Sequence, residues 1–339
     1  MKTLLLVSGA LIAGIGSLLT TSLHDRALYD EDFIKSKPSP EFKWNQAAPA
    51  GTGSYQEEWK PGAWPMGFDP LIGPDNKLWM IGQKLSWSSS DGIAWNGYPK
   101  KDWGERIYMQ RIYFRNKIFA FGGVEVGKGF RNDLWVSRDG KVWEQLTAKA
   151  AWMPRRGQTM TEFQGKLWLF GGTPDPEEND TNKIMNDIWS SDDGIAWTKI
   201  SDNAPWRPRK HPEAVVFKDQ LWLMGGIDHA DVWRSGDGKT WTQVTEKAPW
   251  ETRSDFGLKV YNNLMFVFGG RGGNPARDFN DVWYSIDGSD WRLQTEHAPW
   301  VEQTGTHSVV FRDKLWLYNG KHKGQPRAGD IWTMEAANN

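Results

Sequence analysis

The sequence predicts an all-β fold, a six-bladed β-propeller with four antiparallel strands in each blade. Three observations lead to this fold class. All 23 tryptophans except Trp59 fall at four positions of a unit that recurs with a period of about 40–54 residues, provided that Trp44 is counted with the last unit. Four units contain an apolar run that ends in Gly-Gly, and five contain an Asp-Gly pair between two β-rich runs. Such repetition is typical of one supersecondary unit stacked on its neighbours.

The unit from Gly157 to Trp206 illustrates the four strands of a blade. Its apolar second run, Leu-Trp-Leu-Phe, ends in Gly-Gly, and an Asp-Gly turn separates its last two runs. Asp-Gly is a strong hairpin signal, because both of its residues can take positive φ. The four runs that we expect to form strands are residues 158–162, 167–170, 186–189 and 197–200.

The tryptophans are expected to pack between adjacent sheets, since a residue present in every unit serves the unit. Two of the four positions matter most below: the third position of the unit, and the position that closes it. The third-position residues are Trp95, Trp143, Trp197, Trp241 and Trp291. The closing residues are Trp64, Trp103, Trp152, Trp206, Trp250 and Trp300.

The two ends of the repeat predict how the ring closes. The sixth unit stops after Trp332-Thr333-Met334 and lacks its fourth strand. The segment at residues 41–49 resembles that missing strand, with Trp44 in place of the absent third-position tryptophan. We therefore expect this N-terminal strand to pair in the last blade, which removes the largest exposed edge and gives a propeller over residues 41–336.

The N-terminal residues predict export. Residues 3–19 form an apolar run behind Lys2, so residues 1–22 are interpreted as a signal peptide or an uncleaved anchor, and residues 23–40 as a linker. The propeller would then be extracytoplasmic, either periplasmic or secreted. The chain has no cysteine, which excludes disulfides and thiolate metal sites. A formal net charge of -1 gives no basic field for binding nucleic acid. We also expect the protein to be a monomer.

Two sequence features resemble known repeat families. The runs FAFGG, LWLFGG, LWLMGG and FVFGG, each followed by a tryptophan, resemble the kelch repeat. That resemblance implies a propeller whose relatives are mostly binding scaffolds, with a few enzymes. The pattern Ser-x-Asp-Gly-x-x-Trp is also similar to the Asp-box turn of sialidase-type propellers, with one residue fewer before the tryptophan. Neither resemblance fixes an activity.

The first candidate site lies three residues after each closing tryptophan. Four units carry arginine there, and we expect these side chains at the mouth of the central channel, where their mutual repulsion must be compensated. Two alternatives stay open: capture of an anionic ligand, or pairing between blades with the aspartates that precede the second-position tryptophans. The residues at this position are Arg106, Arg155, Arg209, Arg253, Gln303 and, in the first unit, Gly67.

Two residues further on, the units differ from one another, as a ligand site on a symmetric ring requires. His211 and Asp255 belong to neighbouring units and could form an acid–base pair. Tyr108, beside Arg106, is a further ligand-binding candidate. The variable loops between second and third strands are expected to open on the same face. The full set of unequal positions is Asp69, Tyr108, Gly157, His211, Asp255 and Gly305.

The leading functional hypothesis is a binding or interaction module for a polar, anionic partner such as a saccharide or a peptide. The alternative is an extracytoplasmic sugar isomerase or mutarotase resembling the kelch-type sialic acid epimerase, with His211 and Asp255 as acid and base. A purely structural envelope protein is a third class. The sequence favours a non-enzymatic module. It contains no cofactor motif, and no ligand spacing among its histidines supports a metal site.

Overall fold

The computed structural model describes residues 41–49, 69–82, 85–99, 103–174, 183–318 and 330–336, all of them in the compact unit Pro40–Asn339. The predicted signal segment and linker, Trp59, Trp64, Gly67 and part of the loop after Thr173 lie outside these ranges. The regular secondary structure of the described residues is β-strand apart from short 3₁₀ turns such as Pro74–Asn76. None of their helices is long and apolar enough to cross a membrane.

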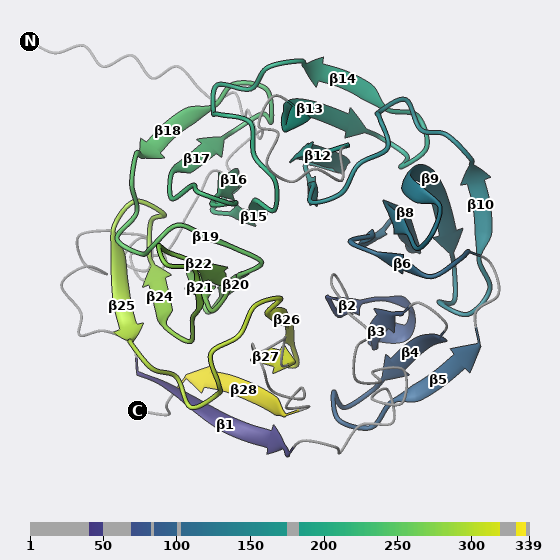
Figure 1. Cartoon of the computed structure of the whole chain (residues 1–339). Helices are drawn as coiled ribbons and strands as arrows, with labels where there is room; N and C mark the ends of the chain where they lie inside the picture. Colours follow the sequence, from purple (N-terminus) through teal and green to yellow (C-terminus); the bar gives the residue numbers. More distant parts are fainter. Residues whose placement is uncertain are drawn as a thin grey trace, which may run out of the picture. The chain divides into compact units, whose positions relative to one another are not determined.

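The fold is the predicted all-β propeller, with sheets arranged around a common axis (Figure 1). Five sheets in the described ranges have four antiparallel strands, a sixth has four such strands and one extra short strand, and we call these six sheets blades 1 to 6. Blade 1 comprises β2 (Leu71–Ile72), β3 (Leu78–Ile81), β4 (Leu85–Ser89) and β5 (Asn96–Pro99). Blade 2 comprises β7 (Gln110–Phe114), β8 (Lys117–Glu125), β9 (Gly129–Ser137) and β10 (Glu144–Thr147), and β6 (Arg106–Ile107) also pairs with β8.

The next three blades repeat this order. Blade 3 comprises β11 (Thr159–Phe163), β12 (Lys166–Gly172), β13 (Met185–Ser191) and β14 (Thr198–Ser201). Blade 4 comprises β15 (Glu213–Phe217), β16 (Gln220–Met224), β17 (Val232–Ser235) and β18 (Thr242–Thr245). Blade 5 comprises β20 (Gly257–Tyr261), β21 (Leu264–Phe268), β24 (Val282–Ser285) and β25 (Trp291–Thr295). A small extra sheet beside it comprises β19 (Arg253–Ser254), β22 (Arg271–Gly272) and β23 (Arg277–Asp278).

Blade 6 joins the two ends of the repeat, as predicted. It comprises β26 (His307–Phe311), β27 (Lys314–Tyr318), β28 (Ile331–Ala336) and β1 (Phe42–Ala48). β1 pairs with β28 and places Trp44 opposite Met334. The Trp44 ring lies 4.0 Å from the ring of Trp300, so it takes the third-position role that the sixth unit lacks. The innermost strands then contact one another in the cyclic order β2, β7, β11, β15, β20, β26 and back to β2.

The tryptophans form the core between blades, as expected. One apolar cluster joins Trp222 and Met224 of blade 4 to Met265 and Trp291 of blade 5. Each closing tryptophan in the described ranges meets the third-position tryptophan of the next blade edge to face; Trp250 and Trp291, for example, lie 4.5 Å apart at 88°. Aromatic pairs prefer this geometry and gain about 0.5–1.5 kcal/mol beyond the area they bury.

The Asp-Gly pairs lie between the third and fourth strands of their blades, as predicted. Only the glycine takes positive φ, for example Gly194 at +80°, whereas Asp193 does not. The reason is that side chains organise the turn: Ser191 Oγ accepts from Gly194 N at 2.8 Å, and Asp193 Oδ1 accepts from Ile195 N and Ala196 N. A side chain on Gly194 would also collide with Phe119 of the preceding blade, so this glycine permits close packing between blades.

Candidate functional site

The four repeated arginines are buried inside their own blades. Each is 1–4% exposed and forms a two-pronged ion pair with the aspartate that precedes the second-position tryptophan. Of the two alternatives that the sequence left open, the structure contains the Arg–Asp pairing, but within one blade rather than between blades. The shortest N–O distances are 2.5 Å for Arg106–Asp133, 2.6 Å for Arg155–Asp187, 2.7 Å for Arg209–Asp231 and 2.7 Å for Arg253–Asp281.

Arg155 shows how few donors remain for a ligand. Its Nη1 donates to Gly171 O and to Asp187 Oδ1, its Nη2 to Asp187 Oδ2, and its Nε to Met153 O. The carboxylate of Asp187 in turn accepts from Trp189 Nε1 at 2.7 Å. Because a buried charge must be paired and hydrogen-bonded, this arrangement serves the blade. In blade 6 Gln303 takes the arginine position; it is fully buried, and its backbone bridges Phe279 and Gly270.

The unequal positions do converge. Tyr108, Gly157, His211, Asp255 and Gly305 all take left-handed φ between +53° and +66°, just before an innermost strand begins. Non-glycine residues adopt this conformation rarely, and such positions gather at functional sites. Backbone hydrogen bonds also link neighbouring blades here, since His211 N donates to Gly157 O and Gly305 N donates to Asp255 O.

His211 and Asp255 are neighbours, as the sequence predicted. His211 Nδ1 lies 2.9 Å from Asp255 Oδ1, and Ser254 Oγ donates to the other carboxylate oxygen. The Tyr108 ring lies 5.3 Å from the His211 ring, and the Arg156 guanidinium lies over Tyr108. Desolvation opposes ionisation of Asp255, but the charge and hydrogen bond of His211 outweigh it and lower the pKa of this carboxyl.

A second imidazole–carboxylate pair joins blade 6 to blade 1. His307 Nδ1 of β26 lies 3.2 Å from Asp69 Oδ1, just before β2. The Asp69 side chain is 60% exposed, so it is accessible to solvent, whereas His307 is buried. Desolvation by the surrounding protein opposes ionisation of Asp69. The hydrogen bond from His307 and the charges of His307, Lys259 and Arg111 outweigh it and lower the pKa of Asp69.

Three further charged residues on the innermost strands belong to this site, and sequence reasoning missed them. They are Arg111 on β7, Glu213 on β15 and Lys259 on β20. Burial lowers the pKa of Arg111 while the charge of Asp69 opposes the shift. Burial raises the pKa of Glu213 to about 8; Asp69 and Asp255 add to this shift, and Lys259 opposes it. Their signal in the sequence is a charged residue inside a short strand that is otherwise apolar.

We call this set the inner-strand cluster. It contains both signs of charge and is drawn from five blades, so it can bind a polar ligand through several charge-assisted hydrogen bonds. Perturbed carboxyls beside imidazoles are also typical of acid–base sites. No group of three or more His, Asp or Glu side chains in the described ranges is arranged to hold a metal ion. The members are Asp69, Arg111, His211, Glu213, Asp255, Lys259 and His307.

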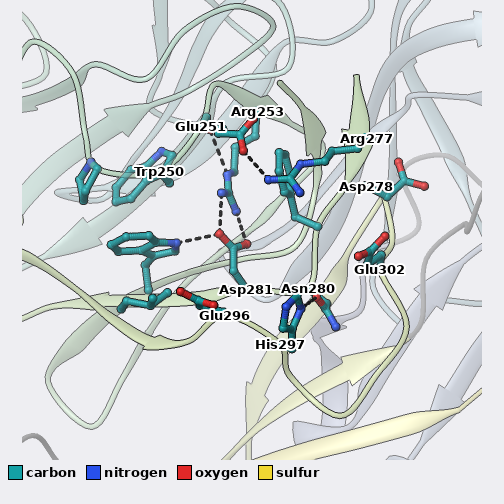
Figure 2. A pocket seen from close by; sticks show the side chains of 14 residues that line it. Trp250, Glu251, Arg253, Arg277, Asp278, Asn280, Asp281, Glu296, His297 and Glu302 are labelled. Carbon is teal, nitrogen blue, oxygen red and sulfur yellow. Dashed lines mark hydrogen bonds and ion pairs between the residues drawn. The ribbon is translucent and has the colours of Figure 1, made fainter. Parts of the chain in front are cut away.

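A separate hollow of about 450 Å³ lies in blade 5 (Figure 2). Its walls are the closing tryptophan Trp250, the Arg253–Asp281 pair and several carboxylates. Arg277 Nη2 pairs with Glu251, and His297 Nδ1 lies 3.3 Å from Asn280 Oδ1 (Figure 2). Several of its charged groups therefore compensate one another, which makes the inner-strand cluster the better candidate for a ligand site.

Comparisons with known proteins agree with the fold. Residues 99–237 match the model of the DUF6242 beta propeller domain. A solved structure titled "Structure of YjhT" aligns with a TM-score of 0.67 at 14% identity, over 82% of this chain and 97% of that chain. At this identity the likeness shows the fold alone. These matches confirm the predicted β-propeller, and the kelch type stays a prediction.

Two curated proteins match parts of the chain. One is Ras guanine nucleotide exchange factor F of Dictyostelium discoideum, 30% identical over 98 residues, which are 28% of this chain. The other is tRNA wybutosine-synthesizing protein 2/3/4 of Oryza sativa subsp. japonica, 25% identical over 130 residues, which are 37% of this chain. The matches span only 8% and 12% of those two proteins.

Proposed function

We propose that the protein is an exported kelch-type propeller that acts as a binding module, with the inner-strand cluster as its ligand site. The ligand is a polar molecule with an anionic group, either a saccharide or a peptide. Its anionic group is bound by Arg111 and Lys259 rather than by the four repeated arginines, because those side chains are already engaged by aspartates.

One observation carries this proposal. Charged side chains from five blades gather where the innermost strands begin, although nothing in the repeat requires charge there. Burial of charge costs free energy, and burial shifts the pKa of both Glu213 and Arg111 toward the neutral form of the side chain, so charge is costly at this site. A ligand that brings complementary charges would offset this cost.

The test is a binding screen of glycans, peptides and metabolites against the wild type, Arg111→Gln and Arg111→Lys. Arg115→Gln is the matched control, because Arg115 is an exposed arginine in the turn just after the same strand. We expect Arg111→Gln to weaken binding at least about 10-fold, the loss of one charge-assisted hydrogen bond of roughly 1.5–3 kcal/mol. Equal binding by both glutamine variants would contradict the proposal.

The 2.9 Å contact between His211 and Asp255 favours a second candidate, a sugar isomerase or mutarotase in which this pair moves the proton. A carboxylate that orients an imidazole is a recurrent acid–base arrangement. Under this hypothesis a panel of acidic sugars gives a bell-shaped rate profile that His211→Ala abolishes, while His297→Ala in the blade 5 hollow keeps it. Absence of turnover across the panel would refute the enzymatic candidate.

Export is the remaining part of the proposal. The apolar run at residues 3–19 supports an extracytoplasmic location, either released or anchored. Fractionation of cells that express the full chain with a C-terminal tag tests this, since recovery in the cytoplasm alone would exclude export. The mass of the tagged protein then distinguishes cleavage near residue 22 from an uncleaved anchor. Light scattering of the purified protein tests the expected monomer.

A further inference from the structure

Two features set the hollow in blade 5 apart from the corresponding parts of the other blades that the structure describes. Arg277 and Asp278 in its wall belong to the extra β22–β23 hairpin (Figure 2). Leu293 on β25, also in the wall, lies opposite the second-position tryptophan Trp283 on β24. The residue opposite this tryptophan is polar or glycine in the other five blades: Gly97, Gln145, Lys199, Gln243 and Gln46. The apolar side chain at this position is therefore specific to blade 5.

Trp283 and Leu293 form an apolar side of the hollow. Leu293 is 39% exposed and Trp283 is partly exposed, so both can be reached from the hollow. The Trp283 ring is held in place, because its Nε1 donates to Asp281 Oδ2 at 2.8 Å. In blade 3 the Lys199 ammonium lies 5.1 Å from the centroid of the equivalent ring, Trp189. Leucine in place of that lysine lets a ligand pack on an aromatic and an aliphatic surface together.

Most of the charge in the hollow is already compensated. Three of its five carboxylates pair with an arginine: Asp281 with Arg253, Glu251 with Arg277, and Asp278 with Arg271. The other two, Glu296 and Glu302, are exposed, so water screens their attraction for a cation. An anionic ligand would meet more carboxylates than guanidinium groups and would compete with them for the arginines. The hollow therefore favours a ligand without net charge.

The paired groups keep hydrogen-bonding capacity for a neutral ligand. Arg277 and Glu251 contact each other through Nη2 and Oε1. A guanidinium has several N–H donors and a carboxylate has several lone-pair sites, so this contact uses only part of either group. The Arg277 guanidinium also lies 5.1 Å from the centroid of the Phe279 ring, which helps to fix its plane. A hydroxyl group both donates and accepts, so it can bond to either group while the ion pair stays intact.

We propose that the blade 5 hollow is a second binding site, and that its ligand is a neutral saccharide. A pyranose ring has hydroxyl groups at its edge and C–H groups on its faces. The edge hydroxyls bond to Arg277 and Glu251, and one face packs on Trp283 and Leu293. The volume of about 450 Å³ lies within the roughly 300–1,000 Å³ of typical ligand pockets. This site is separate from the inner-strand cluster and does not depend on the function proposed for that cluster.

The experiment is titration calorimetry with the methyl glycosides of glucose, galactose and mannose. Each is compared with its uronic acid counterpart, in which a carboxylate replaces the primary hydroxyl group. We expect at least one neutral glycoside to bind the wild type. Its uronate should bind at least about 10-fold more weakly, because the added carboxylate faces the like charges of the hollow.

Two variants test the two sides of the hollow, and circular dichroism with a thermal melt verifies that each is folded. Leu293→Gln introduces the residue that blades 2, 4 and 6 have at this position, and it should weaken binding of the neutral glycoside at least about 10-fold. The reverse change in blade 4, Gln243→Leu, is its control. Arg277→Gln should also weaken binding at least about 10-fold. Its control is Arg234→Gln, at an exposed arginine on β17. Both controls should change the affinity by less than about 2-fold.

Three results would overturn the inference: no neutral glycoside binds the wild type, Leu293→Gln and Arg277→Gln both leave binding unchanged, or a uronate binds more tightly than its neutral counterpart in a manner that depends on Leu293. Arg111→Gln separates this inference from the proposed function. Binding of a neutral glycoside in the hollow should be unchanged in Arg111→Gln and weakened in Leu293→Gln. An anionic ligand of the inner-strand cluster should show the opposite pattern, so either proposal can fail while the other stands.

Discussion

The buried Arg155–Asp187 pair leads to the most decisive structural prediction. Replacing Arg155 by methionine removes the four hydrogen bonds that the guanidinium donates, two of them to Asp187 at 2.6 and 2.8 Å. Asp187 keeps only the bond from Trp189 Nε1 among these partners, while its side chain stays 13% exposed. Breaking one partner out of a buried pair costs about 3–5 kcal/mol, because an uncompensated charge remains. That is a large share of the roughly 5–15 kcal/mol that stabilises a typical domain.

The assay is guanidinium unfolding followed by tryptophan fluorescence, with Arg115→Met as the control for loss of an exposed arginine. We expect Arg155→Met to lower the free energy of unfolding by about 3–5 kcal/mol and the control to change it by less than about 1 kcal/mol. The double variant Arg155→Met/Asp187→Leu should lose less than the sum of the two single variants, since no lone charge is then buried. If Arg155→Met loses less than about 1 kcal/mol of unfolding free energy but no longer binds ligand, the reasoning is refuted and the repeated arginines belong to the ligand site.

Three further predictions concern pH and ring closure. The pKa of Glu213 is raised from 4.5 to about 8. The stability that its proton provides is therefore complete below about pH 4.5 and is lost as the pH rises to about 8. In Glu213→Gln, the unfolding midpoint should fall less between pH 5 and pH 8 than it does in the wild type. The pKa of Asp193 lies below 3.8; desolvation opposes this shift, but the backbone hydrogen bonds from Ile195 and Ala196 outweigh it, so its stabilisation is present above that pH and is lost in stronger acid. Asp193→Asn should therefore narrow the stability difference between pH 5 and pH 2.5, and an unchanged difference would contradict the role of the turn. Trp44→Ala should lower the free energy of unfolding by about 2–3 kcal/mol, because Trp44 is only partly buried and a fully buried aromatic costs roughly 3–5 kcal/mol. Equal melting temperatures of the variant and the wild type would argue against closure through β1.

The fold could be predicted because its determinants are repeated. A tryptophan or glycine that recurs at one position reports a contact that every blade must make, and Gly194 against Phe119 is one such contact. Closure was also predictable, since Trp44 supplies the aromatic ring that Trp300 requires. The turn geometry was not, because the hydrogen bonds of Ser191 and Asp193 organise a turn in which the glycine alone has positive φ.

The candidate site could be predicted only in part. The comparison of equivalent loop positions singled out His211 and Asp255, whose contact the structure contains. It also singled out the arginines, because a recurrent charge has the same sequence signal whether it binds a ligand or pairs within the blade. Only the position of Asp187 relative to Arg155 distinguishes these roles, and that position depends on how β11 and β13 lie in one sheet.

Glu213, which the sequence analysis missed, follows a rule that the ring geometry explains. Glu213 and His307 both begin innermost strands, and each pairs with the last residue of its neighbouring strand, Met224 or Tyr318. They are therefore equivalent positions of two blades. All innermost strands begin around one axis, so equivalent positions of different units become neighbours in space. In the sequence these positions are far apart, because a whole unit lies between them. A ligand site on a propeller should thus be sought by comparing each inner-strand position across the units and selecting the positions that disagree in charge. Applied to this chain, that comparison places Glu213 and His307 in one set, and the pairing of His307 with Asp69 then leaves Glu213 as the carboxyl that lacks an imidazole.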